Sequence, residues 1–449
     1  MPDTFGTATI ERLAAQLREP AWLAQLRRHA WQRHTQLPWP HKSDDVWRRT
    51  DVALLDPLQG FSPAETSLHQ AIPVNEAQLA ALTQPLGDEQ RIVRVNGAWL
   101  TEPQVPGVTI EELSAAAQAN PDPIRQAIEA DGLTDAEQKL TSLNLAFHHD
   151  GLVIRVPAGY VGTAPLRLVR LFSASAQQAI FPLTVITVGA GSAVTIIDEA
   201  ISLARWSPTP PRRGDQTAGS PGAAHLVNAR TELILEQGAS VHYVRLQRWD
   251  ASAREFLLQR ATLAEGASLT SANLTLGAAL SKAHLVTKLL GERASARLYG
   301  FVFGHGHQHV DQHTLQDHQA PHTESDLQFK AALQDHSRMI YTGLIRIAKT
   351  AAQTHAYQAN HNLLLSDTAR AETIPMLEIL ADDVQCKHGA SIGPIDEEQT
   401  FYLRSRGIPR EHAQRLLAMG FIEPIIQQIP FEPLQQRLRE EIEGSLHSQ

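Results

Sequence analysis

The pattern of apolar and polar residues divides the chain into three parts. Over the first 115 residues or so, apolar residues recur at helical spacing, as at Leu13 and Leu17. From about Leu143 the pattern changes to short runs rich in β-branched residues between glycine-containing turns, which predicts strands. After Gly393 the helical spacing returns. We therefore expect helical ends around a β-structured middle.

One turn sequence recurs through the middle of the chain. The stretches GAGSAV, EQGASV, AEGASL and GERASA carry equivalent serines, at Ser192, Ser240, Ser268 and Ser295. The last two intervals are 28 and 27 residues, and the first falls from 48 to 29 when the Pro/Gly-rich stretch 206–224 is treated as an inserted loop. A repeat of about 28 residues built from strands and turns is typical of a solenoid. A parallel β-helix is its natural form, because each rung buries its inner face only when other rungs stack on it.

These changes of pattern define the expected domains of a mainly β protein. Residues 1–140 should form an N-terminal helical domain, and residues 394–449 a C-terminal helical domain. The core, residues 141–393, should be the parallel β-helix, with a flexible insertion at 206–224. A chain of 449 residues is longer than one compact core usually serves, which agrees with this division.

Composition and charge exclude several classes of function. A net charge of −9 and the lack of a basic stripe argue against a nucleic-acid partner. The chain has no apolar run of the ~18–20 residues that a membrane helix needs, and its start lacks the pattern of a secretory signal, so we expect a cytoplasmic protein without a membrane partner. It contains no Gly-Lys dipeptide and hence no Walker A loop, which excludes a P-loop ATPase.

Six histidines lie between residues 304 and 322 and suggest a metal site. In a strand, His305, His307, His309, Asp311 and His313 would share one face, and imidazole with carboxylate suits Zn, Fe or Mn. However, metal sites normally lie in concave pockets, whereas the outer face of a solenoid strand is exposed. We therefore expect a solvated histidine-rich surface with at most weak metal affinity. A histidine-rich metal-binding β protein remains the alternative.

The single cysteine, Cys386, excludes an internal disulfide and belongs to the stretch LEILADDVQCKHGASIG. Along a strand, Val384, Cys386 and His388 would project to one face. A thiolate and an imidazole suit iron or zinc, but they are too few for a four-coordinate site. Any further ligands would have to come from a partner. The alternative is a buried, inert cysteine.

The stretch GASIG at 389–393 matches the G-x-S-x-G pattern of hydrolase nucleophiles. It lies between an expected strand and an expected helix, as that pattern requires. Only 56 residues follow it, however, which is too few for the further strands of an α/β-hydrolase. We therefore do not expect a serine hydrolase.

The segment HNLLLSDTARAETIPMLEILADDVQCKHGASIGPIDEEQTFYLRSRGIPREHAQRLLAMGFIEPII resembles the C-terminal signature of the SufB/SufD family of iron–sulfur cluster assembly proteins. The likeness extends upstream through THAYQANHN, YTGLIRIAK, LQDHQAPHTESDLQFKAAL and SLNLAFHHDGLVIRVPAG to EPAWLAQLRRHAWQRHTQLPWP, and covers nearly the whole chain. The pairing of DDVQCKHGASIG with FYLRSRGI is highly specific. The N-terminal Pro-Trp and Trp-Arg elements and the lone cysteine resemble the SufD branch.

The resemblance implies a right-handed parallel β-helix between N-terminal and C-terminal helical domains. It implies a non-catalytic scaffold subunit that pairs with SufB through the β-helix and binds SufC, an ABC-type ATPase, which would supply the missing Walker A loop. Iron or a transient iron–sulfur cluster would lie at the interface with SufB, with none tightly bound in the isolated chain. A SufB-like homodimeric scaffold is the alternative.

The resemblance also implies roles for particular residues. Cys386 and His388 match the family's cysteine and histidine near the subunit interface, where His388 would act with a SufB cysteine on the nascent cluster. His318 lies in a stretch that matches the family, so we expect the fold to constrain its position.

The stretch FYLRSRGI is assigned by the same resemblance mainly to SufC docking, with packing of the terminal helices as the alternative. Its members are Phe401, Tyr402 and Leu403 as an apolar anchor, Arg404 and Arg406 as partners for carboxylates, and Gly407 and Ile408. Independently of the resemblance, Asp396 with Gln399 predicts a capped helix start and Gly407 predicts its end.

Overall fold

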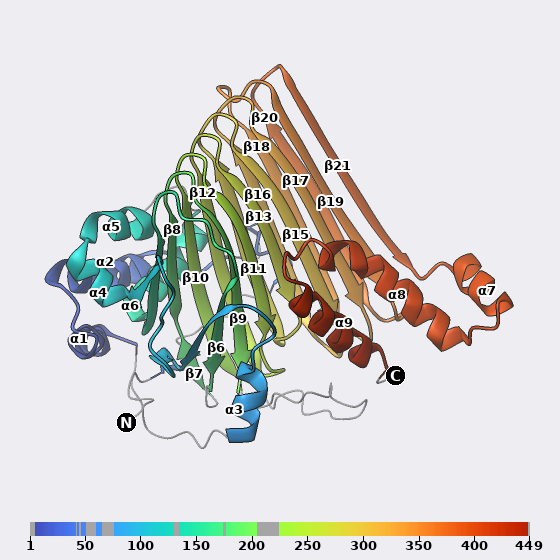
Figure 1. Ribbon diagram of the computed structural model, residues 1–449, viewed down its shortest axis with the longest axis horizontal. Coiled ribbons are helices and arrows are strands. Elements are labelled where there is room, and N and C mark those ends of the chain that lie inside the picture. Colours follow the sequence, from blue (N-terminus) through green and yellow to red (C-terminus); the bar gives the residue numbers. More distant parts are fainter. Residues whose placement is uncertain are drawn as a thin grey trace.

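The computed structural model describes residues 5–41, 43–44, 46–50, 60–64, 76–129, 134–173, 177–203 and 224–447. It is mainly β, with 43% strand and 26% helix, and forms a β-solenoid of about 7 turns with helices at both ends of the chain (Figure 1). The expected parallel β-helix between helical segments is therefore confirmed. Of the insertion expected at 206–224, all but Ala224 lies outside the described residues.

Two sheets form the walls of the β-helix, and within each the neighbouring rungs pair in parallel. Sheet A contains β5 (Asp150–Val156), β8 (Pro182–Val188), β10 (His225–Leu235), β12 (Ala253–Leu263), β14 (Leu280–Leu289), β16 (His309–His318), β18 (Arg338–Ile347) and β20 (Arg370–Ile379), with the short β7 (Gln178–Ile180) beside β10. Sheet B contains β6 (Leu166–Phe172), β9 (Ala193–Ser202), β11 (Ser240–Arg248), β13 (Ser268–Thr275), β15 (Ser295–Gly304), β17 (Glu324–Leu333), β19 (Thr354–Leu364) and β21 (Val384–Pro394).

The recurring turn fixes the register of the rungs, with one shift. Ser240, Ser268 and Ser295 are direct register neighbours, as the repeat predicts. Ser240, however, pairs with Ala193 rather than with Ser192, so the first copy of the turn is offset by one residue.

A left-handed backbone residue closes each copy of this turn. Gly191, Gly238 and Gly266 have φ of 66°, 66° and 62°, which glycine adopts without steric cost. In the degenerate copy GERASA the same role falls to Arg293, with φ of 60°. The glycines of the repeat are thus explained by backbone geometry.

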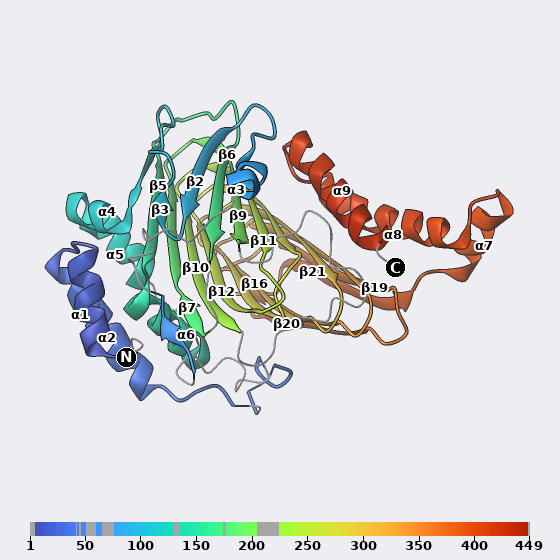
Figure 2. The same ribbon diagram turned by 90° about the horizontal axis from the view of Figure 1, so that it is seen from below.

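The interior of the β-helix is mainly apolar but includes buried ion pairs, Arg170 with Asp198 and Arg245 with Glu255, and both outer faces are largely covered. Alternate residues of each strand face inward, such as Ile154, Ile186 and Leu233, and form one continuous core. Helices α1 (Thr7–Gln16), α2 (Ala21–Gln36), α4 (Leu113–Ala119), α5 (Pro121–Glu129) and α6 (Asp135–Phe147) pack on sheet A, and α8 (Arg410–Ile426) and α9 (Glu432–His447) pack on sheet B. Figure 2 shows these two groups of helices on opposite sides of the β-helix.

The first 140 residues contain strands as well as helices. They include β1 (Ser62–Pro63), β2 (Gln90–Val95), β3 (Ala98–Trp99) and β4 (Thr109–Glu112), besides the short helix α3 (Glu76–Thr83). Strand β2 pairs with β6 and β4 pairs with β5, so this part of the chain extends both sheets. The boundary expected at 140/141 falls inside α6, which ends at Phe147.

The start of the C-terminal segment follows its local sequence. The carboxylate of Asp396 accepts hydrogen bonds from the backbone N–H groups of Glu398 and Gln399, at 2.8 and 3.4 Å, and so caps α7 (Glu397–Ser405) as expected. The helix ends before Gly407, whose φ of 88° suits glycine. Among the helices of the described residues, none combines the length and the apolar character needed to cross a membrane.

Candidate functional site at the open end of the β-helix

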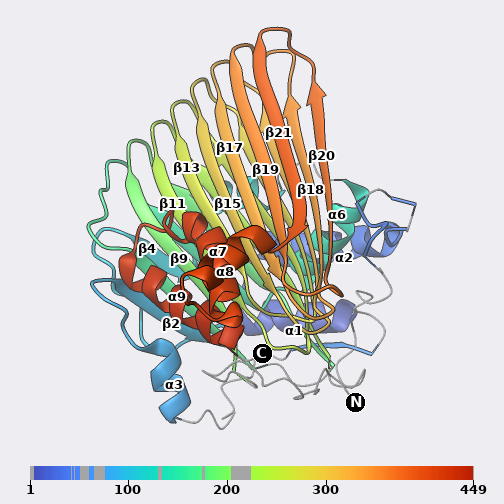
Figure 3. The same cartoon turned by 90° about the vertical axis from the view of Figure 1, so that its right-hand side faces the viewer.

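The last rung of the β-helix is left open. Strand β20 pairs only with β18, and β21 only with β19, so each presents an edge that no strand of the described residues covers (Figure 3). Of the 12 large apolar side chains that are exposed among the described residues, five lie on these two strands or directly beside them: Met376, Leu377, Ile379, Leu380 and Ile392. Unpaired backbone groups next to exposed apolar side chains form a template for a further strand.

Cys386 and His388 lie on this open rung. In the register of β19 and β21, Cys386 pairs with Ala356 and His388 with Gln358. Ala356 and Gln358 are buried, and Gln358 donates a hydrogen bond to the carbonyl of Gly343 across the interior, at 3.2 Å. Since register neighbours in a sheet project to the same side, Cys386 and His388 also project inward, at the mouth of the β-helix.

The surroundings of the two side chains differ. Cys386 is partly buried against a small cluster that includes Ile345 and Ile347, and this burial raises the pKa of its thiol. His388 is exposed. A metal ion or a nearby positive charge would be needed to favour the thiolate.

This arrangement offers two ligands and no more. No group of three or more His, Cys, Asp and Glu side chains is arranged to hold a metal ion within the part of the chain that the structure describes. Cys386 and His388 could hold iron only together with ligands from another molecule, which would have to approach the open rung.

Helix α7 exposes two aromatic side chains to solvent. Thr400 is its only buried residue, while Phe401 and Tyr402 are 70% and 57% exposed. The guanidinium of Arg406 lies over the Tyr402 ring, 5.3 Å from its centroid. The rest of the FYLRSRGI stretch is exposed at Arg404 and Gly407 and half-buried at Leu403 and Ile408. Exposed aromatic and arginine side chains are typical of the residues that dominate protein interfaces.

The histidine tract forms only in part the solvated surface that its composition predicts. Strand β16 starts only at His309, and His305 and His307 belong to the preceding turn, where His307 is exposed. His309, Asp311 and His313 do share the outer face of sheet A, but Asp311 and His313 are buried. The expectation of a solvated surface was therefore wrong for Asp311 and His313, because a distant segment covers this face, whereas His307 is exposed as expected.

That segment is 46–50, which we call the strap. Its Trp47 is fully buried and stacks on Phe256 of β12, with ring centroids 5.8 Å apart. Thr50 donates a hydrogen bond to the carboxylate of Asp311 and lies 3.3 Å from Nε2 of His309. The strap thus joins the N-terminal part of the chain to the histidine-bearing strand.

Lys282 neutralises the buried carboxylate under the strap. Its Nζ donates to Oδ2 of Asp311 at 2.6 Å and to the carbonyl of Val46 at 2.8 Å, and lies 3.0 Å from Nε2 of His313. Burial alone would raise the pKa of Asp311, but Lys282 and His313 hold it well below its usual range. Burial, reinforced by Lys282, lowers the pKa of His313 to about 4. Asp311 and His313, two of the side chains that suggested a metal site, are therefore already in contact with an internal cation.

Two further sequence expectations concern single residues. His318 is buried, and its ring nitrogens lie 2.8 Å from the hydroxyls of Thr323 and Ser325, so the fold constrains it as expected. Ser391 of GASIG lies within β21 and 2.7 Å from Nδ1 of His361, not at a turn between strand and helix. It therefore does not have the geometry of a nucleophile elbow.

The apolar side chains of the open rung were missed at the sequence level. Leu377 and Ile379 alternate in PMLEIL as in an ordinary half-buried strand, and nothing local marks that strand as the last one. Only the return of the helical pattern after Gly393 indicates that these strands belong to the last rung.

Comparison with known proteins now identifies the family. The model of the SUF system FeS cluster assembly SufBD core domain matches residues 171–421, and that of the SufBD protein N-terminal region matches residues 11–168. The chain belongs to the SufBD family. The resemblance drawn from its motifs is confirmed, and the core match includes Cys386, His388 and the FYLRSRGI stretch.

Individual SufBD proteins align over most of their length. The chain is 27% identical over 405 residues to the iron–sulfur cluster assembly protein SufD of Escherichia coli, covering 89% of this chain and 87% of the relative. It is also 27% identical over 406 residues to an iron–sulfur cluster assembly SufBD family protein of Synechocystis, covering 89% and 86%. A SufBD family protein of Staphylococcus aureus is 24% identical over 441 residues, covering 95% and 91%.

Proposed function

We propose that the protein is a non-catalytic scaffold subunit of the SufD kind, which pairs with SufB and binds the ATPase SufC in a cytoplasmic complex that assembles iron–sulfur clusters. It has no tightly bound cofactor of its own, and the cluster or its iron is cargo. Membership of the SufBD family and the similarity to a SufD protein support this assignment.

The observation that carries the proposal is the open last rung. A stacked repeat needs a terminal unit that covers its apolar end, and here the last rung leaves Leu377, Ile379 and Ile392 exposed. A second β-helix of the same family could add its own edge to β20 and β21 and bury these side chains. SufB is the partner with such an edge that the family resemblance implies.

Cys386 and His388 would lie at this junction and supply two ligands to a nascent cluster. The cysteines and other ligands that this chain lacks would come from SufB. Iron binding would also help to deprotonate the Cys386 thiol, whose pKa burial has raised. Because the site is shared, the cluster would be held only while the two subunits are joined.

The ATPase would bind at α7. The chain contains no Walker A loop, so any ATP-driven step needs another protein. The exposed Phe401 and Tyr402 offer an aromatic anchor to that protein, and Arg404 and Arg406 offer charges for its rim.

The test is co-expression of the full chain with SufB and SufC, read by light scattering after gel filtration and by anaerobic cluster reconstitution. We expect a complex of all three proteins that forms an absorbing cluster. His388→Ala should leave the complex intact and abolish the cluster. His355→Ala is the matched control, because His355 is an exposed histidine on the neighbouring strand β19 and lies outside the open rung.

Two further variants should separate the two surfaces. Phe401→Ala with Tyr402→Ala should release SufC and keep SufB, whereas Ile392→Lys should release SufB and keep SufC. A chain that forms a stable homodimer and does not combine with SufB would overturn the proposal in favour of a SufB-like homodimeric scaffold.

A further inference from the structure

Two exposed histidines lie face to face at one corner of the β-helix. His307 belongs to the turn between β15 and β16, and His336 belongs to the turn between β17 and β18. Their ring centroids are 4.9 Å apart, and the planes of the rings differ by only 6°. Only His307 is part of the histidine tract, so the fold rather than the tract brings the two imidazoles together.

The register of the rungs fixes this pairing. Strands β15 and β17 end at register neighbours, and strands β16 and β18 begin at register neighbours. The turns 305–308 and 334–337 between them therefore have the same length, and His307 and His336 hold the same position in each. Residues at equivalent positions of neighbouring rungs stack on one another, as these two rings do.

Hydrogen bonds continue the parallel ladder through the two turns. The backbone N–H of His336 donates to the carbonyl of Gly306 at 2.9 Å, and the carboxylate of Asp335 accepts a hydrogen bond from the backbone N–H of Gly306, also at 2.9 Å. Gly306 and Asp335 have φ of 58° and 55°, so the two turns also share a backbone conformation. The imidazoles are thus mounted on a fixed frame at the surface.

Two imidazoles placed in this way suit a divalent transition-metal ion. Imidazole nitrogen is a preferred ligand of Zn²⁺ and Cu²⁺. With Zn–N bonds of about 2.0–2.1 Å, two nitrogens on one tetrahedral ion lie about 3.4 Å apart. Exposed rings whose centroids are 4.9 Å apart can reach this separation by rotation of the side chains alone.

The neighbouring side chains do not complete a coordination shell. One oxygen of Asp335 is already bonded within the turn, and His305 is half-buried. Throughout the described residues, no three His, Cys, Asp or Glu side chains converge on a common position for a metal ion. A metal ion on His307 and His336 would therefore keep water at its other positions, and its binding should be weak and reversible.

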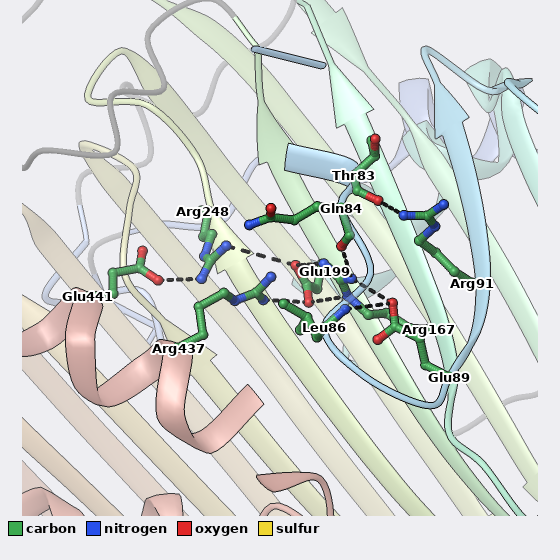
Figure 4. Close-up of polar contacts among 10 residues, drawn as sticks. All are labelled: Thr83, Gln84, Leu86, Glu89, Arg91, Arg167, Glu199, Arg248, Arg437 and Glu441. Atoms are coloured by element: carbon green, nitrogen blue, oxygen red, sulfur yellow. Dashed lines mark hydrogen bonds and ion pairs between the residues drawn. The ribbon is translucent and has the colours of Figure 1, made fainter. Parts of the chain in front are cut away.

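The charged group around Glu199 on sheet B shows what closes other parts of the outer surface to a metal ion (Figure 4). Glu199 is fully buried, and its Oε1 lies 2.6 Å from Nη2 of Arg437 on α9 and 2.9 Å from Nε of Arg167. Glu441 of α9 pairs with Arg248. A metal ion would have to displace a guanidinium group from either carboxylate, whereas the two stacked imidazoles face solvent.

We propose that His307 and His336 form a binding site for a divalent transition-metal ion, separate from the open rung. Cys386 and His388 need further ligands from a partner, whereas the two ligands of this site both come from the present chain. The site should therefore take up a metal ion in the isolated protein, and it does not depend on SufB or SufC.

Calorimetric titration with Zn²⁺ tests the site in the full chain, purified without a histidine tag. The starting variant carries Cys386→Ser and His388→Ala, so that the open rung contributes no ligand. We expect one ion per chain, bound with micromolar affinity. His307→Ala and His336→Ala should each weaken binding by at least about tenfold, because loss of a group that merely orients a metal ligand already costs about 10–100-fold. The matched control is His322→Ala, which removes another exposed histidine of the tract and should leave the affinity unchanged.

Electron paramagnetic resonance of bound Cu²⁺ counts the nitrogen ligands directly. One equivalent of Cu²⁺ should show splitting from two nitrogens in the starting variant and from one after His336→Ala, with unchanged circular dichroism to verify the fold. An affinity for Zn²⁺ that His307→Ala and His336→Ala leave unchanged would overturn the proposal. So would an affinity that only one of them lowers, or that His322→Ala lowers equally, since both imidazoles must bind the same ion.

Discussion

The first and last turns of the β-helix are built from similar strands but are finished in different ways. At the first turn, β4 pairs with β5 and β2 with β6, and Val153, Ile154 and Ile186 are buried. At the last turn, β20 and β21 keep free edges, and Ile379 and Ile392 are 40% and 44% exposed. The chain thus covers one end of the solenoid with its own N-terminal segment, while the described residues leave the other end open. Stability should reside in the covered parts and function at the open end.

The buried carboxylate of Asp311 under the strap gives the largest expected difference in the free energy of unfolding between covered and open regions. Lys282→Met would leave Asp311 buried without a cation and should lower the free energy of unfolding by about 3–5 kcal/mol. The matched variant Arg346→Met breaks a pair with Glu378, in which both side chains are about 40% exposed or more, and should cost less than about 1 kcal/mol. Urea unfolding followed by circular dichroism measures both.

The double variant Lys282→Met with Asp311→Leu controls for the loss of packing. Removing both charges should recover much of the stability that Lys282→Met loses. If Lys282→Met and Arg346→Met proved equally mild, the strap would not depend on the buried ion pair.

Isoleucines at the two ends of the β-helix, Ile186 and Ile392, give the next largest expected difference in the free energy of unfolding. Ile186→Ala should lower the free energy of unfolding by about 2–5 kcal/mol, because Ile186 is 1% exposed in the core of the first turns. Ile392→Ala on the open rung should cost less than about 1 kcal/mol, since less apolar area is lost. Comparable losses in urea unfolding of the isolated chain would show that the last rung is already covered, for example by a second copy.

Lowering the pH should destabilise the covered part of the chain, because histidines buried there are neutral in the folded state. Burial lowers the pKa of His318 to about 4, whereas in the unfolded chain it binds a proton near pH 6.5. Between about pH 6.5 and 4 only the unfolded chain binds a proton at this histidine. The free energy of unfolding is therefore at its full value above about pH 6.5 and falls as the pH decreases towards 4, by up to ~1.4 kcal/mol per pH unit. His318→Gln should reduce the slope of stability against pH between 7 and 5, measured by urea unfolding. An unchanged slope would contradict a buried neutral imidazole at this position.

The repeat could be predicted from the sequence because the signal is local. Each copy of the turn carries its own glycine or, at Arg293, a residue in the same backbone conformation, so the spacing of the rungs appears directly in the chain. The shift at Ser192 escaped prediction because the first interval contains the insertion. Strand β2 was missed although QRIVRV contains three β-branched residues, since the helical pattern around it dominated.

The candidate site was predictable only in part. The spacing of Cys386 and His388 is enough to place them on one face of a strand, as the register shows. The burial of Asp311 in the histidine tract could not be predicted, because its partner Lys282 lies on another rung and its partner Thr50 is 261 residues away in the chain. Alternation along a strand tells which side chains share a face, but not which distant segment covers that face.

Hydrogen exchange of the chain alone and in complex with SufB and SufC tests the central claim most directly. The account predicts that peptides covering β20 and β21, residues 370–394, exchange more slowly in the complex, while peptides from the first turns, residues 150–188, are unchanged. Unchanged exchange over 370–394 in an intact complex, or protection confined to the first turns, would contradict the claim that the open end of the β-helix is the partner-binding site.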